Sequence, residues 1–304
     1  MNRARPLTAP YSIVTAARNR TAQLRITAAS ISRFGSHAEH LIVDWSSHEP
    51  ITTADLPADP RLRLLRVEGE RAWWLSRAYN RGFCMAACPW ILKADADAVL
   101  GEAFFRGFDP AVATLQLRHM TSALTGKTNL DDLGLFSVDA AALRAVRGFN
   151  PWLVGWGVDD IDLFERLFVL PGTRLAHLGA EGVHCLPHGD ALRLGAPETA
   201  DQAVGPMRRL SHRLQLQARL EANRTLAALA RSGCLPSIPE PMGQEPAELL
   251  QRLPPPLLAR RHRALLAGLC RPLVGRASMA VARVIPSPWL PPLLTRLGLA
   301  DPLP

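Results

Sequence analysis

Hydrophobic and polar positions in the first hundred residues alternate between short apolar runs and longer stretches with helical spacing. Buried strands are predicted at 11–17, at 40–44 and from residue 90 onward, and 61–67 alternates charged and apolar residues as a half-buried strand does. Helical spacing fills 22–34, which Gly35 ends, and about 73–88, which Pro89 ends. Repeated strand and helix segments of these lengths predict an α/β fold on a mainly parallel central sheet flanked by helices.

The same patterns continue to about residue 195 and then change. Further strands are predicted at 112–117, 134–138, 174–178 and 182–185, with a helix at 140–147 capped by Asp139 and a polar loop at 121–132. Beyond residue 196 the chain reads as a long helix at 206–231, Pro-rich linkers at 237–241 and 254–256, and short basic helices at 257–297. We therefore expect an α/β domain at 1–195 and a helical, Pro/Arg-rich C-terminal extension at 196–304.

Charge is distributed unevenly over the 304 residues. The formal net charge is +8, and the segment from Gln251 to Pro304 alone has eight arginines and one acid, Asp301. The rest of the chain is close to neutral, which argues against a nucleic-acid partner. The basic segment has two interpretations that stay open: helices lying on an anionic membrane, or helices packed on the rest of the protein with their arginines in water.

Cysteine usage and the N-terminus bear on the compartment. The five cysteines show neither a disulfide framework nor paired zinc-ligand spacing. No apolar segment follows Met1 as in a signal peptide, and no uncharged apolar stretch approaches the roughly 18 residues of a transmembrane helix. We expect a cytoplasmic protein, with the inner membrane face as the place where the basic segment would make peripheral contact.

Two carboxylates end the apolar run that starts at Trp90. Asp95 and Asp97 are two residues apart, so in an extended or turning backbone both project to the same side. Carboxylate oxygens suit Mg²⁺ or Mn²⁺, which leave coordination positions for phosphate oxygens. The alternative is a turn with two solvated acids.

A second chemistry-bearing stretch runs from Gly148 to Leu167. A loop rich in Gly and Trp leads into a helix start that carries Asp159, Asp160 and Asp162. Helix capping explains some of these acids, because the macrodipole stabilises negative charge there. Three acids beside Trp156 exceed what capping requires, which favours a sugar-stacking wall next to a general base.

Three further residues are candidates for the site. Asp44 ends the second predicted strand, where it would accept hydrogen bonds from a base or ribose or would serve as a loop or capping acid. His184 and His188 follow a late strand and could complete an Asp/Asp/His metal site. A structural role for each histidine stays open.

Taken in order, four motifs of this chain resemble the GT-A glycosyltransferases, particularly family-2-like enzymes and the β-1,4-galactosyltransferase group. The motifs are the strand at 12–15 with Asn19-Arg20, the helix start at 76–82, the Asp95-Ala96-Asp97 triplet, and Gly-Trp-Gly-Val-Asp-Asp-Ile-Asp at 155–162. The last resembles the galactosyltransferase pattern G-W-G-G-E-D-D-D. The chain departs from the family at Ala16, Val158 and Ile161.

This resemblance implies a site and a cofactor. It places Asp97, supported by Asp95, on a Mn²⁺ or Mg²⁺ ion, with His184 matching the later metal histidine better than His188 does. It makes Asp160 the catalytic base, with Asp159 and Trp156 positioning the acceptor sugar. The residues that it implies at the nucleotide sugar are Thr15, Arg18, Arg20, Asp44, Arg77, Asn80, Asp95 and Trp156.

The function implied is inverting, metal-dependent transfer of a sugar from a nucleotide-diphosphate donor, with UDP as the expected nucleotide, to a hydroxyl of a glycan or other acceptor. One alternative is a non-catalytic protein of the same fold that binds nucleotide sugars or carbohydrates. Another is a metal-dependent nucleotidyltransferase, which would normally carry a Gly-rich triphosphate loop after the first strand. The segment from Thr15 to Arg20 has no glycine.

Overall fold

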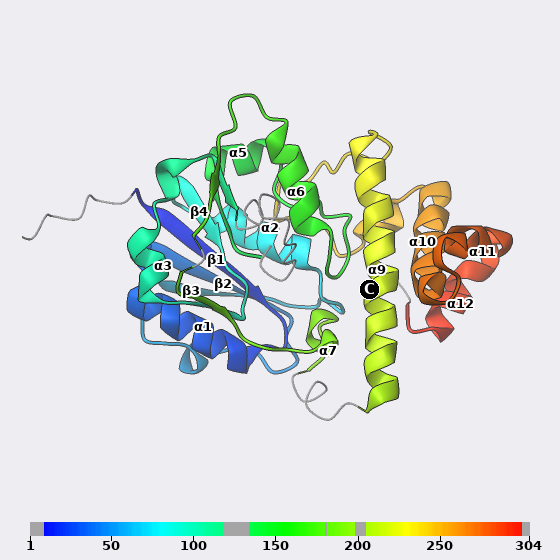
Figure 1. Ribbon diagram of the computed structural model, residues 1–304, viewed down its shortest axis with the longest axis horizontal. Helices are drawn as coiled ribbons and strands as arrows, with labels where there is room; N and C mark the ends of the chain where they lie inside the picture. The colour runs from blue at the N-terminus through cyan, green and yellow to red at the C-terminus, as the bar shows by residue number, and fades with distance from the viewer. Residues whose placement is uncertain (1–8, 118–133, 180, 198–204, 300–304) are drawn as a thin grey trace, which may run out of the picture. The chain divides into compact units, whose positions relative to one another are not determined.

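The computed structural model describes residues 9–117, 134–179, 181–197 and 205–299 (Figure 1). The chain divides into two compact units. Unit 1 comprises Met1–Val67, Ala78–Gly148 and Leu163–Pro187, and unit 2 comprises Glu68–Arg77, Phe149–Asp162 and His188–Pro304. Residues 68–77, 149–162 and 188–195 of the expected first domain are grouped with the C-terminal helices, and the division at residue 195 stays a prediction.

Unit 1 is built on a seven-stranded sheet of order β3-β2-β1-β4-β7-β6-β8. Neighbouring strands are parallel except where β7 pairs with β4 and with β6. The predicted α/β architecture with a mainly parallel sheet is therefore confirmed. The strands are β1 Tyr11–Ala17, β2 Glu39–Trp45, β3 Leu62–Val67, β4 Trp90–Lys93, β6 Leu115–Leu117, β7 Phe136–Asp139 and β8 Leu175–His177, and a separate pair joins β5 Ala98–Leu100 to β9 Val183–Cys185.

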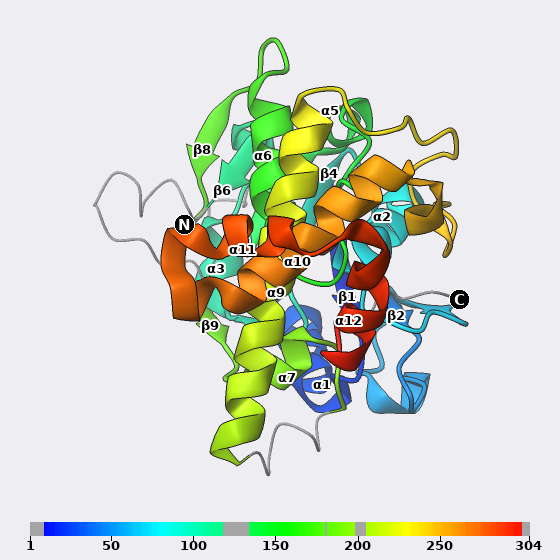
Figure 2. The ribbon, with the colours of Figure 1, turned by 90° about the vertical axis from the view of Figure 1, so that its right-hand side faces the viewer.

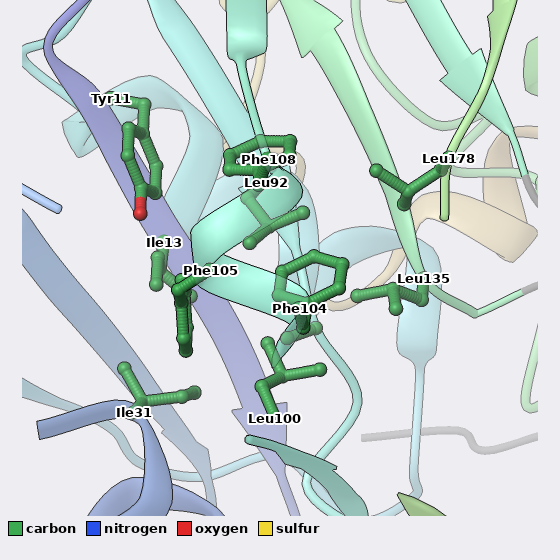
Figure 3. Packing of buried hydrophobic residues seen from close by; sticks show 11 residues of the cluster. Tyr11, Ile13, Ile31, Leu92, Leu100, Phe104, Phe105, Phe108, Leu135 and Leu178 are labelled. Atoms are coloured by element: carbon green, nitrogen blue, oxygen red, sulfur yellow. The ribbon is translucent and has the colours of Figure 1, made fainter. Parts of the chain in front are cut away.

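One face of this sheet is covered by α1 (Thr21–Phe34) and α3 (Glu102–Gly107). Their apolar side chains join Ile13 and Leu92 in one buried cluster, in which Tyr11 and Phe108 meet edge to face with ring centroids 5.0 Å apart (Figure 3). Tyr11 and Ile13 of β1 both reach this cluster because residues two apart in a strand share a face. Aromatic pairs of this geometry add to the stabilisation that burial provides.

The opposite face carries α2 (Leu75–Met85) and α6 (Asp159–Phe168). Gly82 of α2 lies directly over Val14, so that a side chain at this position would collide with it. Phe164 of α6 meets Phe136 of β7 edge to face at 5.2 Å. The short helix α5 (Ala140–Ala145) follows β7 and is capped as predicted, because Asp139 Oδ1 accepts a hydrogen bond from the amide of Ala142 at 2.7 Å.

Unit 2 contains the C-terminal helices, with α10 at the centre of their packing (Figures 1 and 2). Gly268 brings α10 against α9, since an added Cβ would lie 2.6 Å from the carbonyl oxygen of Gln217. Small residues at such a contact let two helix backbones approach closely. The helices are α7 Asp190–Arg193, α9 Pro206–Arg231, α10 Pro255–Val274, α11 Ser278–Val284 and α12 Leu290–Arg296.

The helical prediction for 206–231 is confirmed to the residue, but the expected linker at 254–256 is wrong. Pro255 and Pro256 form the first turn of α10, where proline is tolerated because amides at a helix start have no intrahelical partner. Of the residues expected to form a strand at 112–117, only the last three do so, as β6. Short 3₁₀ helices lie at Thr53–Asp55, Pro110–Val112, Leu249–Arg252, Gly275–Ala277 and Ser287–Trp289.

Two expectations about chain chemistry can be compared with the structure. All five cysteines are free thiols, in line with the absence of a disulfide framework. Among the described residues, one helical stretch, Pro255–Val284, is long and apolar enough to cross a membrane by length and composition alone, and 33% of its most apolar window is buried. Several arginines interrupt it. The polar loop predicted at 121–132 lies outside the described residues.

Candidate functional site

The two acids of the D-x-D motif lie in the turn between β4 and β5 of unit 1. Because β1 and β4 are parallel neighbours, the segment that follows β1 meets this turn at the same edge of the sheet. Arg20, three residues beyond β1, places its guanidinium 3.3 Å from Asp97 Oδ2, and both side chains are largely buried. The structure thus brings together Arg20 and Asp97 as expected residues of one site.

Lys93 is a site residue that the sequence analysis missed. Its side chain is fully buried at the end of β4, and its ammonium donates to Asp95 Oδ1 and to the carbonyl of Gly134, each at 2.8 Å. The ammonium also lies 4.6 Å from the centre of the Tyr79 ring, a favourable cation–π geometry. One signal could have identified it: Lys93 is one of only two lysines in the chain and sits within an otherwise apolar strand.

The Asp95 carboxylate is oriented from two sides. Its Oδ1 also accepts a hydrogen bond from the Tyr79 hydroxyl at 2.8 Å. Its Oδ2 lies where a side chain on Gly134 would have to be, so only glycine at 134 leaves room for the carboxylate. The geometry is that of a carboxylate held in one orientation by Lys93, Tyr79 and Gly134.

These residues fit a divalent cation with few protein ligands. Within the described parts of the chain, no three His, Cys, Asp or Glu side chains are grouped closely enough to hold a metal. The triad of Asp95, Asp97 and His184 is therefore not assembled in this structure. Magnesium is commonly bound through one or two carboxylates together with substrate phosphates, so the D-x-D pair is a sufficient protein donor set.

The two candidate histidines occupy different units. His184 is exposed on β9, paired with Val99 of β5, and the amide of the nearby Leu186 donates to the Asp97 carbonyl at 2.8 Å. His188 belongs to unit 2, where its Nδ1 lies 3.2 Å from the carbonyl of Gly189. A metal-binding role for His184 stays a prediction. It is supported by the pairing of β9 with β5, the strand that follows the acid turn.

The residues expected around the uridine are engaged within unit 1. Thr15 is fully buried and its hydroxyl lies 3.0 Å from His40 Nε2. Arg18 donates to the carbonyl of Trp45 at 3.1 Å. Asp44 is fully buried as well, and it accepts hydrogen bonds from the amides of Ser47 (3.1 Å) and Ile51 (3.0 Å) and from Arg66.

These contacts favour the loop-acid interpretation of Asp44, because its carboxylate organises the segment after β2 and pairs with β3. The hydroxyl of Thr15 is likewise occupied inside the sheet. The sequence could not distinguish these roles, since a buried acid at a strand end looks the same in either case. Asn80 is also fully buried, on the part of α2 that belongs to unit 1.

In unit 2 the Gly/Trp loop leads into the start of α6. Asp159 is almost fully buried and its Oδ1 accepts a hydrogen bond from the Gly157 amide at 2.6 Å, so it holds the loop. Asp160, the next residue, is half-buried. Trp156 is also half-buried, and the Arg193 guanidinium lies 5.0 Å from its ring centre. Asp159 therefore positions the loop, whereas Asp160 and Trp156 keep partial exposure.

Arg77, expected at the nucleotide sugar, has its partners in unit 2. It pairs with Glu70 at 2.8 Å, donates to the carbonyl of Glu245 at 2.7 Å and lies over the Trp74 ring at 4.7 Å. Its side chain is only 5% exposed. In this structure Arg77 joins two separate segments of unit 2, and its expected contact with the donor stays a prediction.

Val158 has a backbone conformation that a β-branched residue rarely adopts. Its φ is 72°, in the left-handed region, and the preceding Gly157 has φ 105°. Val158 stands where the galactosyltransferase pattern has glycine, the residue that adopts positive φ without a steric penalty. The loop thus keeps a glycine-type backbone at a position without glycine, and strain of this kind often occurs at functional sites.

Asn223 of α9 is a second residue that the sequence analysis missed. Its amide group donates to the carbonyls of Val154 (3.1 Å) and Gly157 (2.9 Å), and its Oδ1 accepts from the Val154 amide at 3.1 Å. The side chain is 1% exposed. A lone asparagine in a helix that was predicted as an appendage gave no signal of this role.

A cavity of about 690 Å³ lies elsewhere in unit 2, between α7 and the first turns of α9. Asp190 is its acidic lining residue, and Arg213 lies 3.8 Å from it. The remaining charged or titratable side chains of the lining are basic, which suits an anionic group. The full lining is His188, Gly189, Asp190, Pro206, Arg209, Leu210, His212 and Arg213.

Comparison with known proteins gives one family match. Residues 116–181 match a family model described as the N-terminal domain of galactosyltransferase. The matched stretch begins at β6 and includes the Gly/Trp loop and the acids of α6. No match was found among curated protein sequences.

Several solved structures are similar to the chain at low identity. S. aureus TarS (residues 1–349) has 12% identity and a TM-score of 0.45, covering 90% of this chain and 87% of that one. The catalytic domain of Drosophila β1,4-galactosyltransferase 7 has 14% identity and a TM-score of 0.41, covering 67% and 79%. Glucosyl-3-phosphoglycerate synthase from Mycobacterium tuberculosis has 16% identity and a TM-score of 0.45, covering 75% and 81%.

The family match falls on one of the four motifs that carried the resemblance, the Gly/Trp loop with its acids. Residues 116–181 thus carry a galactosyltransferase-type segment, within a mixed α/β fold on a mainly parallel sheet, in agreement with the glycosyltransferase class that the motifs indicated. The structural similarities transfer no residue role to this chain.

Proposed function

We propose that the protein transfers a sugar from a nucleotide-diphosphate donor to an acceptor hydroxyl with inversion at the anomeric carbon, and that the nucleotide is UDP. The observation that carries the proposal is the D-x-D turn, in which Asp95 is oriented by Lys93 and Tyr79 while Asp97 faces Arg20. Similar structures of glucosyl-3-phosphoglycerate synthase contain UDP with Mg²⁺ or with Mn²⁺, which supports this choice of nucleotide and metal.

On this proposal the donor diphosphate is bound by the acid turn and its neighbouring cation. Asp97, with Asp95 in support, would hold Mg²⁺ or Mn²⁺, and Arg20 would contact a phosphate oxygen after releasing Asp97. A bound divalent ion neutralises negative charge that develops on the leaving diphosphate. Binding that strengthens as this charge develops lowers the barrier rather than merely raising affinity.

The acceptor chemistry belongs to the start of α6. Asp160 accepts the proton of the acceptor hydroxyl while the acceptor oxygen forms a bond to the anomeric carbon. The bond from that carbon to the diphosphate oxygen breaks, and its electron pair leaves with the nucleoside diphosphate. Trp156 supplies a flat apolar surface for a sugar ring, and Asp159 holds the backbone through Gly157.

The deciding experiment measures nucleotide release from UDP-, GDP- and dTDP-sugars with Mn²⁺ or EDTA, together with direct nucleotide binding. We expect Mn²⁺-dependent release from a UDP-sugar. Asp160→Asn should lose at least 100-fold in turnover with nucleotide affinity unchanged, and Asp97→Asn should lose the metal dependence of binding. Glu165→Gln, an exposed acid on the same helix, is the matched control.

Each proposed role can fail separately. Equal loss of nucleotide binding in Asp160→Asn would assign that residue a structural role. Retained Mn²⁺-dependent binding in Asp97→Asn would overturn the metal assignment. Binding of every donor without release, even with a panel of glycan acceptors, would favour the binding-protein alternative over the transferase.

A further inference from the structure

The end of α10, α11 and the turn before α12 form an unusual surface of unit 2. Within 17 residues it exposes five large apolar side chains, and we call this set the α11 surface. Leu273 is 87% exposed, Val284 82% and Trp289 69%. The complete set is Leu273, Val274, Val281, Val284 and Trp289.

The α11 helix has one buried and one exposed side. Ser278 and Ala282, four residues apart, are buried and face the packed helices of unit 2. Val281 and Val284, three residues apart, are exposed on the other side. The helix thus packs Ser278, Ala282 and part of Met279 inward but leaves two valines exposed, which burial alone would not select.

The exposed charges within this stretch of the chain are basic. Arg276, in the 3₁₀ turn before α11, and Arg283 of α11 are exposed, whereas Arg271 at the end of α10 is paired with Glu221 of α9 at 2.6 Å. No acidic residue occurs between Glu248 and Asp301. Apolar side chains flanked by arginines, with an exposed tryptophan, match the interfacial region of a bilayer with anionic headgroups.

The packing of α10 distinguishes lying on a membrane from crossing one. Arg261 of α10 is 3% exposed, and burial lowers its pKa to about 9. Gly268 of the same helix lies against the α9 backbone. A helix that buries an arginine and packs closely on a neighbour within its unit is a core helix, so the apolar composition of 255–284 does not require a membrane span.

We propose that the α11 surface binds the headgroup region of an anionic lipid membrane, with Leu273, Val284 and Trp289 inserted and Arg276 and Arg283 on the headgroups. This goes beyond glycosyl transfer and does not depend on it. A neutral bilayer would offer nothing to the arginines, and a second copy of this chain would present the same positive charge, so complementarity favours the anionic membrane over both.

The test is co-sedimentation of the full chain with vesicles of phosphatidylcholine, with and without phosphatidylglycerol. We expect binding only when phosphatidylglycerol is present, with affinity falling as salt rises. The Leu273→Ser/Val284→Ser/Trp289→Ser variant should bind at least tenfold more weakly, and Arg276→Gln/Arg283→Gln should lose most of the salt dependence. Because the side chains replaced in these two variants are exposed, the melting temperature of each variant should stay close to that of the unmodified chain.

Met207→Ser/Val169→Ser is the matched control, since these residues are 78% and 79% exposed and lie outside the α11 surface. The proposal is overturned if the unmodified chain does not bind phosphatidylglycerol vesicles, or if the control weakens binding as much as the triple variant does.

Two other results would assign the surface differently. A dimer in sedimentation velocity that the triple variant abolishes, without lipid binding, would make the surface an interface between copies. Resistance of bound protein to alkaline carbonate would indicate a membrane span.

Discussion

The ammonium of Lys93 lies 2.8 Å from Asp95 Oδ1, two residues further along the chain. The lysine is fully buried, whereas the aspartate side chain is 36% exposed. The pair therefore connects the interior of the sheet to the acid turn. A buried ammonium needs such partners, since an unpaired charge in the interior is strongly disfavoured.

This relationship predicts that Lys93→Met damages both stability and donor binding. The variant removes the cation but keeps most of the side-chain volume. It takes one of two donors from Asp95, which keeps the Tyr79 hydroxyl, and removes the lysine bond to the Gly134 carbonyl. We expect the free energy of unfolding to fall by about 1–3 kcal/mol, measured by urea denaturation. Metal-dependent nucleotide affinity should fall as well, measured by titration with Mn²⁺.

The double variant Lys93→Met/Asp95→Asn separates pairing from packing. If the charge pair matters, the double variant loses less stability than the two single losses added together. Strict additivity, or a Lys93→Met protein as stable as the unmodified chain, would contradict the importance of the pair. Arg63→Met, at a half-exposed basic residue of β3, is the control for loss of a cation.

The positive φ of Val158 predicts that glycine at this position is stabilising. Left-handed backbone costs an L-residue about 1–2 kcal/mol, and the greater flexibility of glycine in the unfolded chain offsets about 0.5–1 kcal/mol of that. We expect Val158→Gly to raise the free energy of unfolding by about 1 kcal/mol. Val158→Ala keeps the strained backbone and should not be stabilising. A glycine variant less stable than the alanine variant would be incompatible with strain at 158.

The hydrogen bonds from Asn223 to the Gly/Trp loop predict that replacing this residue lowers both stability and the affinity for the acceptor. Asn223→Ala removes three hydrogen bonds to the Gly/Trp loop. We expect about 1–3 kcal/mol of lost stability, a raised acceptor KM and unchanged affinity for the nucleotide. Thr225→Ala removes a bond confined to the same helix and serves as control. An unchanged acceptor KM would limit Asn223 to a purely structural role.

Two buried histidines predict acid sensitivity of folding. Burial, as the largest cause, lowers the pKa of His40 to about 3 and that of His37 to about 4. Below pH 6.5 the unfolded chain binds protons that the folded chain does not, so stability falls as the pH drops from about 6.5 towards 4. At about pH 5 the loss is about 2 kcal/mol for each histidine.

Urea unfolding at about pH 7.5 and about pH 5 measures this effect. The His37→Gln/His40→Gln variant should show a weaker dependence, and His48→Gln, at an exposed histidine, should behave like the unmodified chain. Arg61 holds the pKa of the neighbouring Asp59 well below its usual range, but that acid affects stability only below about pH 4. Equal stability at the two pH values would contradict the buried-histidine explanation.

Much of the site was predictable because its signals are local. The D-x-D spacing, the acids at the start of α6 and the long helix at 206–231 depend on neighbouring residues, and the structure has them in those elements. Asp44 shows the limit of such reasoning. Its position at a strand end suggested a ligand contact, but the structure assigns its carboxylate to Ser47, Ile51 and Arg66.

The sequence by itself determined the class of fold and the two acid motifs, because periodicity and motif spacing act over a few residues, and the motifs carried the resemblance to glycosyltransferases. Only the tertiary structure decided which groups orient those motifs. Lys93 reaches Gly134, 41 positions away, and Asn223 reaches Val154, 69 positions away. The physical reason is that a buried polar group must find a partner wherever the fold places one, and that partner is chosen by packing rather than by distance along the chain.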